Sequence, residues 1–215
     1  MSEPSLRITE IFYSLQGEAL KVGCPTVFVR LTGCPLRCQY CDTEYAFSGG
    51  DWMTMTAILA AVDQYNTNYV TVTGGEPLAQ PNCLPLLTKL CDDGYQVSLE
   101  TSGALDISQV DARVVKVMDI KTPASHEQDK NRWANLQYIG AQDQLKFVIC
   151  DRADYLWSCQ CVQRHGLDKQ CEVLFSPSNE QLNAQQLADW ILQDQLAVRF
   201  QIQLHKYLWG NQKGK

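Results

Sequence analysis

The stretch PTVFVRLTGCPLRCQYCDT, residues 25–43, sets a β-rich run directly before three closely spaced cysteines. The run at 26–33 is rich in Val, Phe and Leu over the length of a strand. Cys34, Cys38 and Cys41 follow its end in the pattern C-x-x-x-C-x-x-C. Because parallel α/β sheets carry their functional groups at the carboxyl ends of the strands, the three thiols are predicted to lie in an active-site loop.

Six further runs of the same kind follow along the chain. They lie at 68–75, 95–103, 113–121, 144–151, 171–178 and 198–206. Between several of them, apolar residues recur at helical spacing, for example at Ile58, Leu59, Val62 and Tyr65. Asn183 has the residue type of a helix N-cap before another such segment.

Strands that alternate with helices are typical of a parallel sheet. We therefore predict an α/β fold, built as a partial or irregular (β/α) barrel of about six parallel strands. An open doubly wound sheet is the alternative, and in both layouts the chemistry gathers at the carboxyl ends of the strands. We expect the whole chain, 1–215, to form a single domain.

Composition narrows the class of protein. Apolar residues make up 45% of the 215 residues and charged residues 20%, which suits a packed core and argues against disorder. The net charge of −6 argues against a general nucleic-acid binder. No run of about 18 apolar residues suggests a membrane helix, and the N-terminus does not read as a signal peptide. We therefore expect a cytoplasmic protein, in which a tight cysteine cluster indicates metal binding or catalysis.

Three thiols are one too few for a structural zinc site, which takes four ligands. Cys24 is the nearest other cysteine, but a strand of about seven residues separates it from Cys34, and at roughly 3.3 Å per residue that is about 20 Å. A [4Fe–4S] cluster is usually held by four thiolates, so three would leave one iron open to bind a small molecule. A zinc knuckle or three chance core thiols are the alternatives.

The residue before the third cysteine is aromatic, Tyr40, and the pattern C-x-x-x-C-x-aromatic-C resembles that of radical S-adenosylmethionine enzymes. The resemblance implies that the methionine amino and carboxylate groups of S-adenosylmethionine chelate the open iron. A second motif, TGGEP at 73–77, resembles the GGE motif of the same enzymes. Its paired glycines let a ligand approach the backbone closely, and Glu76 offers a carboxylate to the methionine ammonium.

The other predicted strands also end in polar groups, in ETSG (100–103), DIK (119–121), SPSN (176–179) and LHKY (204–207). Turns are polar in any case, so each of these alone is a weak signal. The resemblance implies an S-adenosylmethionine site made of Tyr40, Cys41, Asp42, Gly74, Gly75, Glu76, Ser102, Asp119, Ile120, Lys121, Ser176, Pro177, Ser178 and Asn179.

A narrower resemblance spans the chain. The segments IFYSLQGEA, FVRLTGC, CDT, TGGEP, ETSG and QLHKYLWG are similar to those of the 7-carboxy-7-deazaguanine synthase family. Two positions depart from it: Ala19 stands where the family often has Gly, and Asp119-Ile120-Lys121 stands where some members have Ser-Pro-Lys. The resemblance implies that Thr43 binds Mg²⁺ and that residues 1–25 form an N-terminal extension that contributes to the substrate site. The implied substrate contacts are Leu15, Gln16, Gly17, Arg30, Thr73 and His205.

The chemistry that this resemblance implies is a radical carbon–nitrogen lyase reaction in queuosine and deazapurine biosynthesis. One electron from the reduced cluster would cleave S-adenosylmethionine, and the resulting 5′-deoxyadenosyl radical would take a hydrogen from 6-carboxy-5,6,7,8-tetrahydropterin. Ring contraction and loss of ammonia would give 7-carboxy-7-deazaguanine. Implied partners are an external reductant such as flavodoxin and a second copy of the chain in a homodimer, with no nucleic acid and no membrane.

Three other interpretations stay open. A glycyl-radical activase would share the short chain and the cluster loop. A non-enzymatic iron–sulfur carrier or a zinc module would have no use for the TGGEP turn. An auxiliary cluster would need the remaining cysteines, but Cys159 and Cys161 fall on a predicted helix, where two residues span about 200° and point the thiols to opposite faces. For these we expect small buried side chains instead.

Overall fold

A single nine-stranded sheet organises the chain in the computed structural model, which describes residues 3–215. The strand order is β3-β1-β2-β4-β5-β6-β7-β8-β9, and all pairs from β2 to β9 are parallel, whereas β1 runs antiparallel to both of its neighbours. The strands are β1 (Ser5–Leu15), β2 (Pro25–Leu31), β3 (Asp51–Thr54), β4 (Tyr69–Gly74), β5 (Gln96–Thr101), β6 (Val115–Ile120), β7 (Gln144–Ile149), β8 (Glu172–Pro177) and β9 (Arg199–Phe200).

The strand order decides between the two predicted layouts. A doubly wound sheet reverses its strand order at a switch point, whereas in β2-β4-β5-β6-β7-β8-β9 the space order follows the chain order throughout. That is the order of a (β/α) barrel, and within the described part of the chain the edge strands β3 and β9 do not pair. The predicted partial barrel is therefore confirmed. It has seven parallel strands, the last of only two residues.

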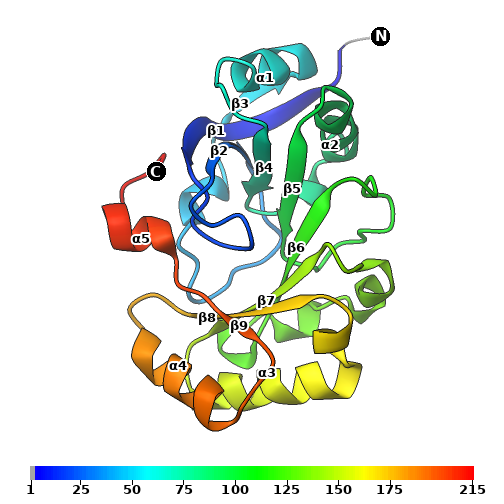
Figure 1. Cartoon of the computed structure of the whole chain (residues 1–215). Helices are drawn as coiled ribbons and strands as arrows, with labels where there is room; N and C mark the ends of the chain where they lie inside the picture. Colours follow the sequence, from blue (N-terminus) through cyan, green and yellow to red (C-terminus); the bar gives the residue numbers. More distant parts are fainter. Residues whose placement is uncertain (1–2) are drawn as a thin grey trace.

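Helices cover the outside of the curved sheet (Figure 1). They are α1 (Met55–Val62), α2 (Cys83–Asp92), α3 (Arg152–His165) and α4 (Ala184–Gln193). The short C-terminal helix α5 (Leu204–Trp209) lies apart from them, and the Leu204 N–H at its start donates to Gly17 O. Short 3-10 turns lie at Glu44–Ala46, Pro77–Ala79, Pro123–Ser125, Gln128–Lys130, Trp133–Tyr138 and Leu167–Lys169. One apolar cluster packs α1 and α2 against β1, β2, β4 and β5, and a second packs α3 and α4 against β6, β7 and β8. No helix within residues 3–215 is long and apolar enough to span a membrane.

Local signals in the sequence explain where the helices begin and end. The predicted cap Asn183 accepts hydrogen bonds from the backbone N–H groups of Gln185 and Gln186 at the start of α4. Asp151 caps α3 in the same way, and Gly166 ends α3 in the left-handed conformation that glycine adopts without strain. These contacts satisfy backbone groups that a helix terminus leaves unpaired.

The inner face of the barrel is filled at one end by the loop between β1 and β2, residues 16–24. Ala19 packs against Val117 and Leu174 of the sheet, and its N–H donates to Gln201 Oε1 at 2.8 Å. Ala19 also has a φ of 65°, in the left-handed region that favours glycine, which gives a physical reason for the glycine often found here in the resembled family. This loop therefore replaces the missing part of the barrel wall.

The long strand β1 lies before the first predicted run, has 11 residues and pairs on both sides. One expectation about the elements needs correction. The last predicted run, 198–206, forms a strand only at Arg199–Phe200, and Leu204–Trp209 is helical. The chain leaves the sheet there because Gln203 and the Leu204 N–H bond to the loop at 16–24, a tertiary contact that outweighs β propensity.

Candidate active site

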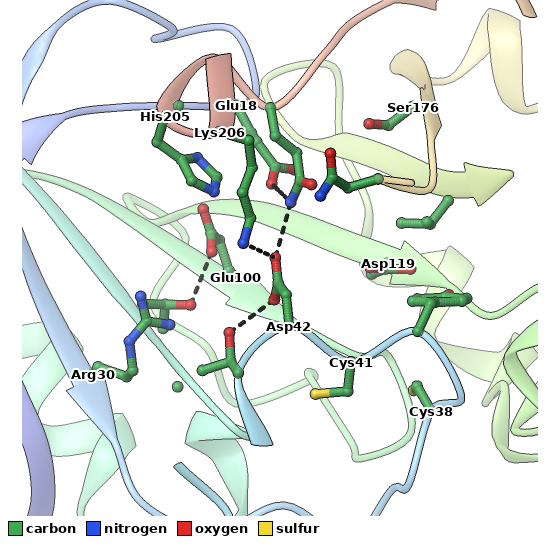
Figure 2. A pocket seen from close by; sticks show the side chains of 18 of the residues that line it. Glu18, Arg30, Cys38, Cys41, Asp42, Glu100, Asp119, Ser176, His205 and Lys206 are labelled. Atoms are coloured by element: carbon green, nitrogen blue, oxygen red, sulfur yellow. Dashed lines mark hydrogen bonds and ion pairs between the residues drawn. The ribbon is translucent and has the colours of Figure 1, made fainter. Parts of the chain in front are cut away.

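A cavity of about 530 Å³ opens at the carboxyl ends of the parallel strands (Figure 2). Of the residues predicted for the site, all but Glu76 and Ile120 line it. The lining set is Leu15, Gln16, Gly17, Arg30, Cys34, Cys38, Tyr40, Cys41, Asp42, Thr43, Thr73, Gly74, Gly75, Ser102, Asp119, Lys121, Ser176, Pro177, Ser178, Asn179 and His205. Residues far apart in the sequence thus share one chamber.

The three-cysteine loop begins just after β2, as the sequence predicts. The Gly33 N–H donates to Ala46 O at 2.7 Å, and the Arg37 side chain donates through Nη1 to the carbonyl oxygen of Cys34 at 2.8 Å, so contacts within residues 33–46 hold the loop. All ten cysteines are free thiols. Burial raises the pKa of Cys34, Cys38 and Cys41, so the ligand-free loop holds protonated thiols that must release protons to bind metal.

The donor set fits an iron–sulfur cluster better than a single ion. Within residues 3–215, no three His, Cys, Asp or Glu side chains converge closely enough to hold one metal ion. A [4Fe–4S] cluster does not require such convergence, because each thiolate binds a different iron. Beside the loop, Tyr40 Oη and Asp119 Oδ1 are buried without hydrogen-bond partners in the described residues, and both side chains line the cavity. Such orphaned polar atoms are expected where a polar cofactor supplies the missing partners.

Gly74 and Gly75 are glycines because the end of β4 lies against the cluster loop. A Cβ at Gly74 would lie 2.3 Å from Leu31 O, and one at Gly75 would lie 2.3 Å from Gly33 O and 2.7 Å from the Cβ of Cys34. Gly74 also has a φ of 152°, which L side chains rarely adopt. From the TGGEP motif we predict that these glycines let a ligand approach the backbone. In the ligand-free chain, the approach of β2 and the cluster loop already requires them.

Glu76 is fully buried and does not line the cavity. Its carboxylate accepts hydrogen bonds from the N–H of Leu78 at 3.0 Å, from Thr101 Oγ1 at 2.9 and 3.0 Å, and from the N–H and hydroxyl of Ser102 at 2.7 and 2.5 Å. These contacts tie the end of β4 to the end of β5. In the ligand-free chain this carboxylate therefore holds a framework position, and its predicted contact with the methionine ammonium stays a prediction. Ile120, which also points away from the cavity, belongs to the apolar core under α3 and α4.

Arg30 of β2 lines the cavity, and its side chain is held in one orientation. Its Nε donates to Glu10 Oε1 at 2.7 Å, and its guanidinium lies 5.7 Å from the ring centroid of Phe12 and 5.9 Å from that of Tyr45. Within residues 3–215, its two terminal nitrogens make no hydrogen bond. That edge of the guanidinium is the one that binds a carboxylate through two parallel hydrogen bonds.

His205 connects the C-terminal segment to the loop at 16–24. A Cβ at Gly17 would lie 2.2 Å from its Nδ1, so glycine is required at this contact. Burial lowers the pKa of His205 below 6.5, although Glu18 and Asp42 act in the opposite direction. The ring is therefore neutral at pH 7 and faces the cavity, where it has one donor and one acceptor.

Five further polar side chains line the cavity but are absent from the predicted set of site residues, namely Glu18, Glu100, Lys146, Gln203 and Lys206. Glu100 and Lys206 belong to the polar strand ends ETSG and LHKY that the sequence singled out. Glu100 and Lys146 are polar residues inside apolar strands, on the face that strand alternation turns toward Asp119. That alternation is the signal that could have found them. Glu18 lies in the loop after β1, outside the strands, and only the tertiary fold brings it here.

The carboxylates of this group respond differently to their surroundings. Burial raises the pKa of Glu100, and nearby Glu18 raises it further. Burial would also raise the pKa of Glu18, but Lys146 and Gln203 together hold it below its usual value. Asp42, which accepts from Gln203 Nε2 at 3.1 Å and from Thr43 Oγ1 at 2.9 Å, also has a lowered pKa despite burial.

A partial barrel with a three-cysteine loop after its first parallel strand defines the class of this protein, the Radical SAM superfamily, whose model matches residues 28–118. The chain is also 44% identical to the 7-carboxy-7-deazaguanine synthase of Chlorobaculum tepidum, over 97% of this chain and 96% of that protein. The corresponding protein of Koribacter versatilis is 43% identical, over 95% and 97%. The chain therefore belongs to the 7-carboxy-7-deazaguanine synthase family.

Solved structures agree on the fold. QueE from Escherichia coli superposes with a TM-score of 0.76 over 93% of this chain and 94% of that one, at 21% identity. Streptococcus suis SuiB bound to S-adenosylmethionine gives a TM-score of 0.55 over 80% of this chain and 48% of that one, at 15% identity. At these identities the likeness concerns the fold alone.

Proposed function

We propose that this chain converts 6-carboxy-5,6,7,8-tetrahydropterin to 7-carboxy-7-deazaguanine with loss of ammonia, as a 7-carboxy-7-deazaguanine synthase in deazapurine and queuosine biosynthesis. The observation that carries the proposal is the shared chamber. The three thiols line this chamber together with Arg30, Gln16 and Gly17, and the Arg30 Nε is bonded to Glu10, which leaves its terminal nitrogens for a ligand. A carboxylate-bearing substrate can therefore lie next to a cluster-bound cofactor.

The residues for each group follow from the cavity. Cys34, Cys38 and Cys41 would hold the [4Fe–4S] cluster, and S-adenosylmethionine would extend from it along the ends of β4, β5, β6 and β8. When bound, these groups supply a 5′-deoxyadenosyl radical that takes a hydrogen atom from the substrate. The protein contributes position, charge and the exclusion of water from this chamber. The orphaned Tyr40 hydroxyl and Asp119 Oδ1 support cofactor binding at this wall.

On the substrate side, the proposed contacts are Leu15, Gln16, Gly17, Arg30, Thr73 and His205. Arg30 would bind the pterin carboxylate with both terminal nitrogens. Thr43 would supply one oxygen to Mg²⁺, with the other ligands coming from substrate and water. We also propose that residues 1–25 complete the substrate site as part of one domain, that the chain works as a cytoplasmic homodimer, and that a flavodoxin-like protein reduces the cluster.

The test is a single-vessel assay. Anaerobically reconstituted protein is incubated with the carboxypterin, S-adenosylmethionine, Mg²⁺ and dithionite or reduced flavodoxin, and the products are identified by mass spectrometry. We expect 7-carboxy-7-deazaguanine and ammonia. Turnover of S-adenosylmethionine without any deazaguanine would overturn the proposed substrate, and zinc in place of iron and sulfide in the purified protein would overturn the cluster.

Two cysteine variants, compared with each other, test the cluster assignment separately. Cys38→Ala removes one of the three loop thiols and should abolish 5′-deoxyadenosine formation while the far-UV circular dichroism stays unchanged. Cys24→Ala is the matched control, because Cys24 lies at the other end of β2 and does not line the cavity. It should keep full iron content and activity. Retained turnover in Cys38→Ala contradicts the cluster assignment.

A further inference from the structure

Lys146 of β7 lines the cavity. Its Nζ lies 2.5 Å from Glu18 Oε2 and 3.8 Å from Asp119 Oδ2. Glu18 follows Gln16 and Gly17, which belong to the proposed substrate wall, whereas Asp119 belongs to the proposed cofactor wall (Figure 2). Within residues 3–215, Lys146 is the only side chain that forms an ion pair with both carboxylates.

The two carboxylates have other partners, but these are not shared. Gln203 Nε2 donates to Glu18 Oε1 at 3.0 Å, and Lys121 Nζ lies 3.2 Å from Asp119 Oδ2. Gln203 Nε2 also donates to Asp42 Oδ2 at 3.1 Å on the proposed cofactor side, but this amide carries no charge, and neither Gln203 nor Lys121 pairs with both Glu18 and Asp119. Asp119 Oδ1 stays buried without a partner in the described part of the chain, so this carboxylate still has an acceptor to offer a ligand.

The charge on Lys146 is secure in this position. Burial alone would lower its pKa, but Glu18, Asp119 and Glu100 raise it above the usual range for lysine, so the ammonium stays charged at neutral pH. Without it, three carboxylates would face one chamber with no shared counter-charge. Like charges in a site of low dielectric repel strongly, so Glu18 and Asp119 would move apart or take up protons.

We propose that Lys146 is a positioning residue that holds the substrate wall and the cofactor wall at a fixed separation and so couples the cleavage of S-adenosylmethionine to reaction of the pterin. This inference rests on the proposed function. Hydrogen transfer to a carbon radical depends on the distance between two bound ligands, and a misplacement of about 1 Å can cost a factor of about 100 in rate. A charge shared by both walls sets that distance from within the protein.

The experiment compares Lys146→Met, Lys146→Arg and the unaltered protein after cluster reconstitution. Without reductant, the dissociation constants for S-adenosylmethionine and for oxidised 6-carboxypterin are measured by equilibrium dialysis. Lys146→Met should weaken both ligands by about tenfold, the factor that loss of a charge-assisted hydrogen bond represents. With reductant, it should form several times more 5′-deoxyadenosine per deazaguanine than the unaltered protein does. Lys146→Arg keeps the charge and should therefore restore most of the affinity for each ligand and most of the normal product ratio.

Lys116→Met is the matched control. Lys116 is also a buried lysine of the sheet, with its Nζ 3.0 Å from Asp143 Oδ2, but it does not line the cavity. Lys116→Met should therefore lower the melting temperature without changing the affinity for either ligand or the product ratio. If Lys146→Met weakens only one ligand or neither, or loses both products in proportion as Lys116→Met would, the proposal is overturned. Deazaguanine formation by the unaltered protein reports separately on the proposed function.

Discussion

Glu100 shows at the scale of one residue that the site is built for ligands and not for stability. Its carboxyl group faces the cavity, where it accepts from Thr73 Oγ1 at 2.8 Å, and burial followed by the nearness of Glu18 raises its pKa. In the ligand-free protein this charge is therefore unfavourable. Functional sites commonly hold such destabilised groups.

We expect Glu100→Gln to raise the melting temperature of the ligand-free protein at neutral pH. Because the pKa is higher in the folded state, the contribution of Glu100 to stability is present below the unfolded value of 4.5 and is lost as the pH rises through the folded value. The gain in Glu100→Gln should therefore be absent below about pH 4.5 and appear above it. Thermal melts across pH 4 to 8 check this, with the exposed Glu44→Gln as control. A gain of equal size at every pH would contradict the assignment.

Gly75 allows a second test at this scale. A Cβ at Gly75 would lie 2.3 Å from Gly33 O, so Gly75→Ala must push the cluster loop away from β4. We expect a loss of about 1–3 kcal/mol in unfolding free energy, typical of overpacking, together with reduced iron content. At Gly140 the nearest atom to a new Cβ is 3.8 Å away, so Gly140→Ala should change stability by less than about 1 kcal/mol. Normal iron content in Gly75→Ala would argue against this reading.

Individual residues were predictable where a local motif fixes them and not where the fold does. The cysteines, Arg30 and the glycines of TGGEP stand in short patterns with a chemical reason, and all of them line the cavity. Glu18 and Lys146 are 128 positions apart in the sequence and meet only because β7 faces the loop after β1. A spacing rule that works within a strand or a helix cannot find such a pair.

At the scale of elements, Glu76 connects two strand ends. Its carboxylate is fully buried and takes hydrogen bonds from Leu78, Thr101 and Ser102, so it locks the end of β5 to the turn after β4. Glu76→Gln replaces one acceptor oxygen with an amide donor that would face these donors. We expect it to lower the unfolding free energy of the ligand-free protein by about 1–3 kcal/mol, measured by urea denaturation.

A matched pair separates this framework role from a purely ligand-binding one. Asp119 is another carboxylate near a strand end, and it lines the cavity with one oxygen unpartnered in the described residues. Asp119→Asn should weaken S-adenosylmethionine binding more than it lowers stability, whereas Glu76→Gln should do the reverse. Equal stability of Glu76→Gln and the unaltered protein would show that the buried contacts do not hold the strand ends.

The elements themselves were mostly predictable because apolar periodicity reports burial. Six of the seven predicted runs contain strands of six or seven residues, and the stripe at Ile58 and Val62 is fully buried on α1. The run at 198–206 failed because its alternating pattern also suits an edge, where β9 pairs with β8 alone. Contacts of Gln203 with Glu18 and Asp42 then favour the turn into α5, and no local pattern encodes them.

At the scale of the whole molecule, the loop at 16–24 makes up for the missing barrel wall. Gln144 Oε1 accepts from the N–H of Leu20 at 2.9 Å, and Gln201 Oε1 accepts from the N–H of Ala19 at 2.8 Å. We expect Gln144→Ala and Gln201→Ala each to cost about 1–3 kcal/mol, because each leaves a backbone donor unpaired. Hydrogen exchange at Ala19 and Leu20 should speed up in the variants while the amides of α2, which do not contact this loop, stay protected. Unchanged exchange at the loop would show that these glutamines do not hold it.

That loop also sets an order of events during synthesis. Residues 16–20 leave the ribosome early, but their partners include Gln144, Gln201 and Leu204, which are made more than a hundred residues later. The β1–β2 hairpin and the first apolar cluster can form from local and neighbouring segments. The loop at 16–24 has no partner to pack against at that stage. Contacts of such large sequence separation are slow to form. We expect the cavity to be completed last, with the three loop thiols of a newly made chain open to solvent and to oxidation until the far strands arrive.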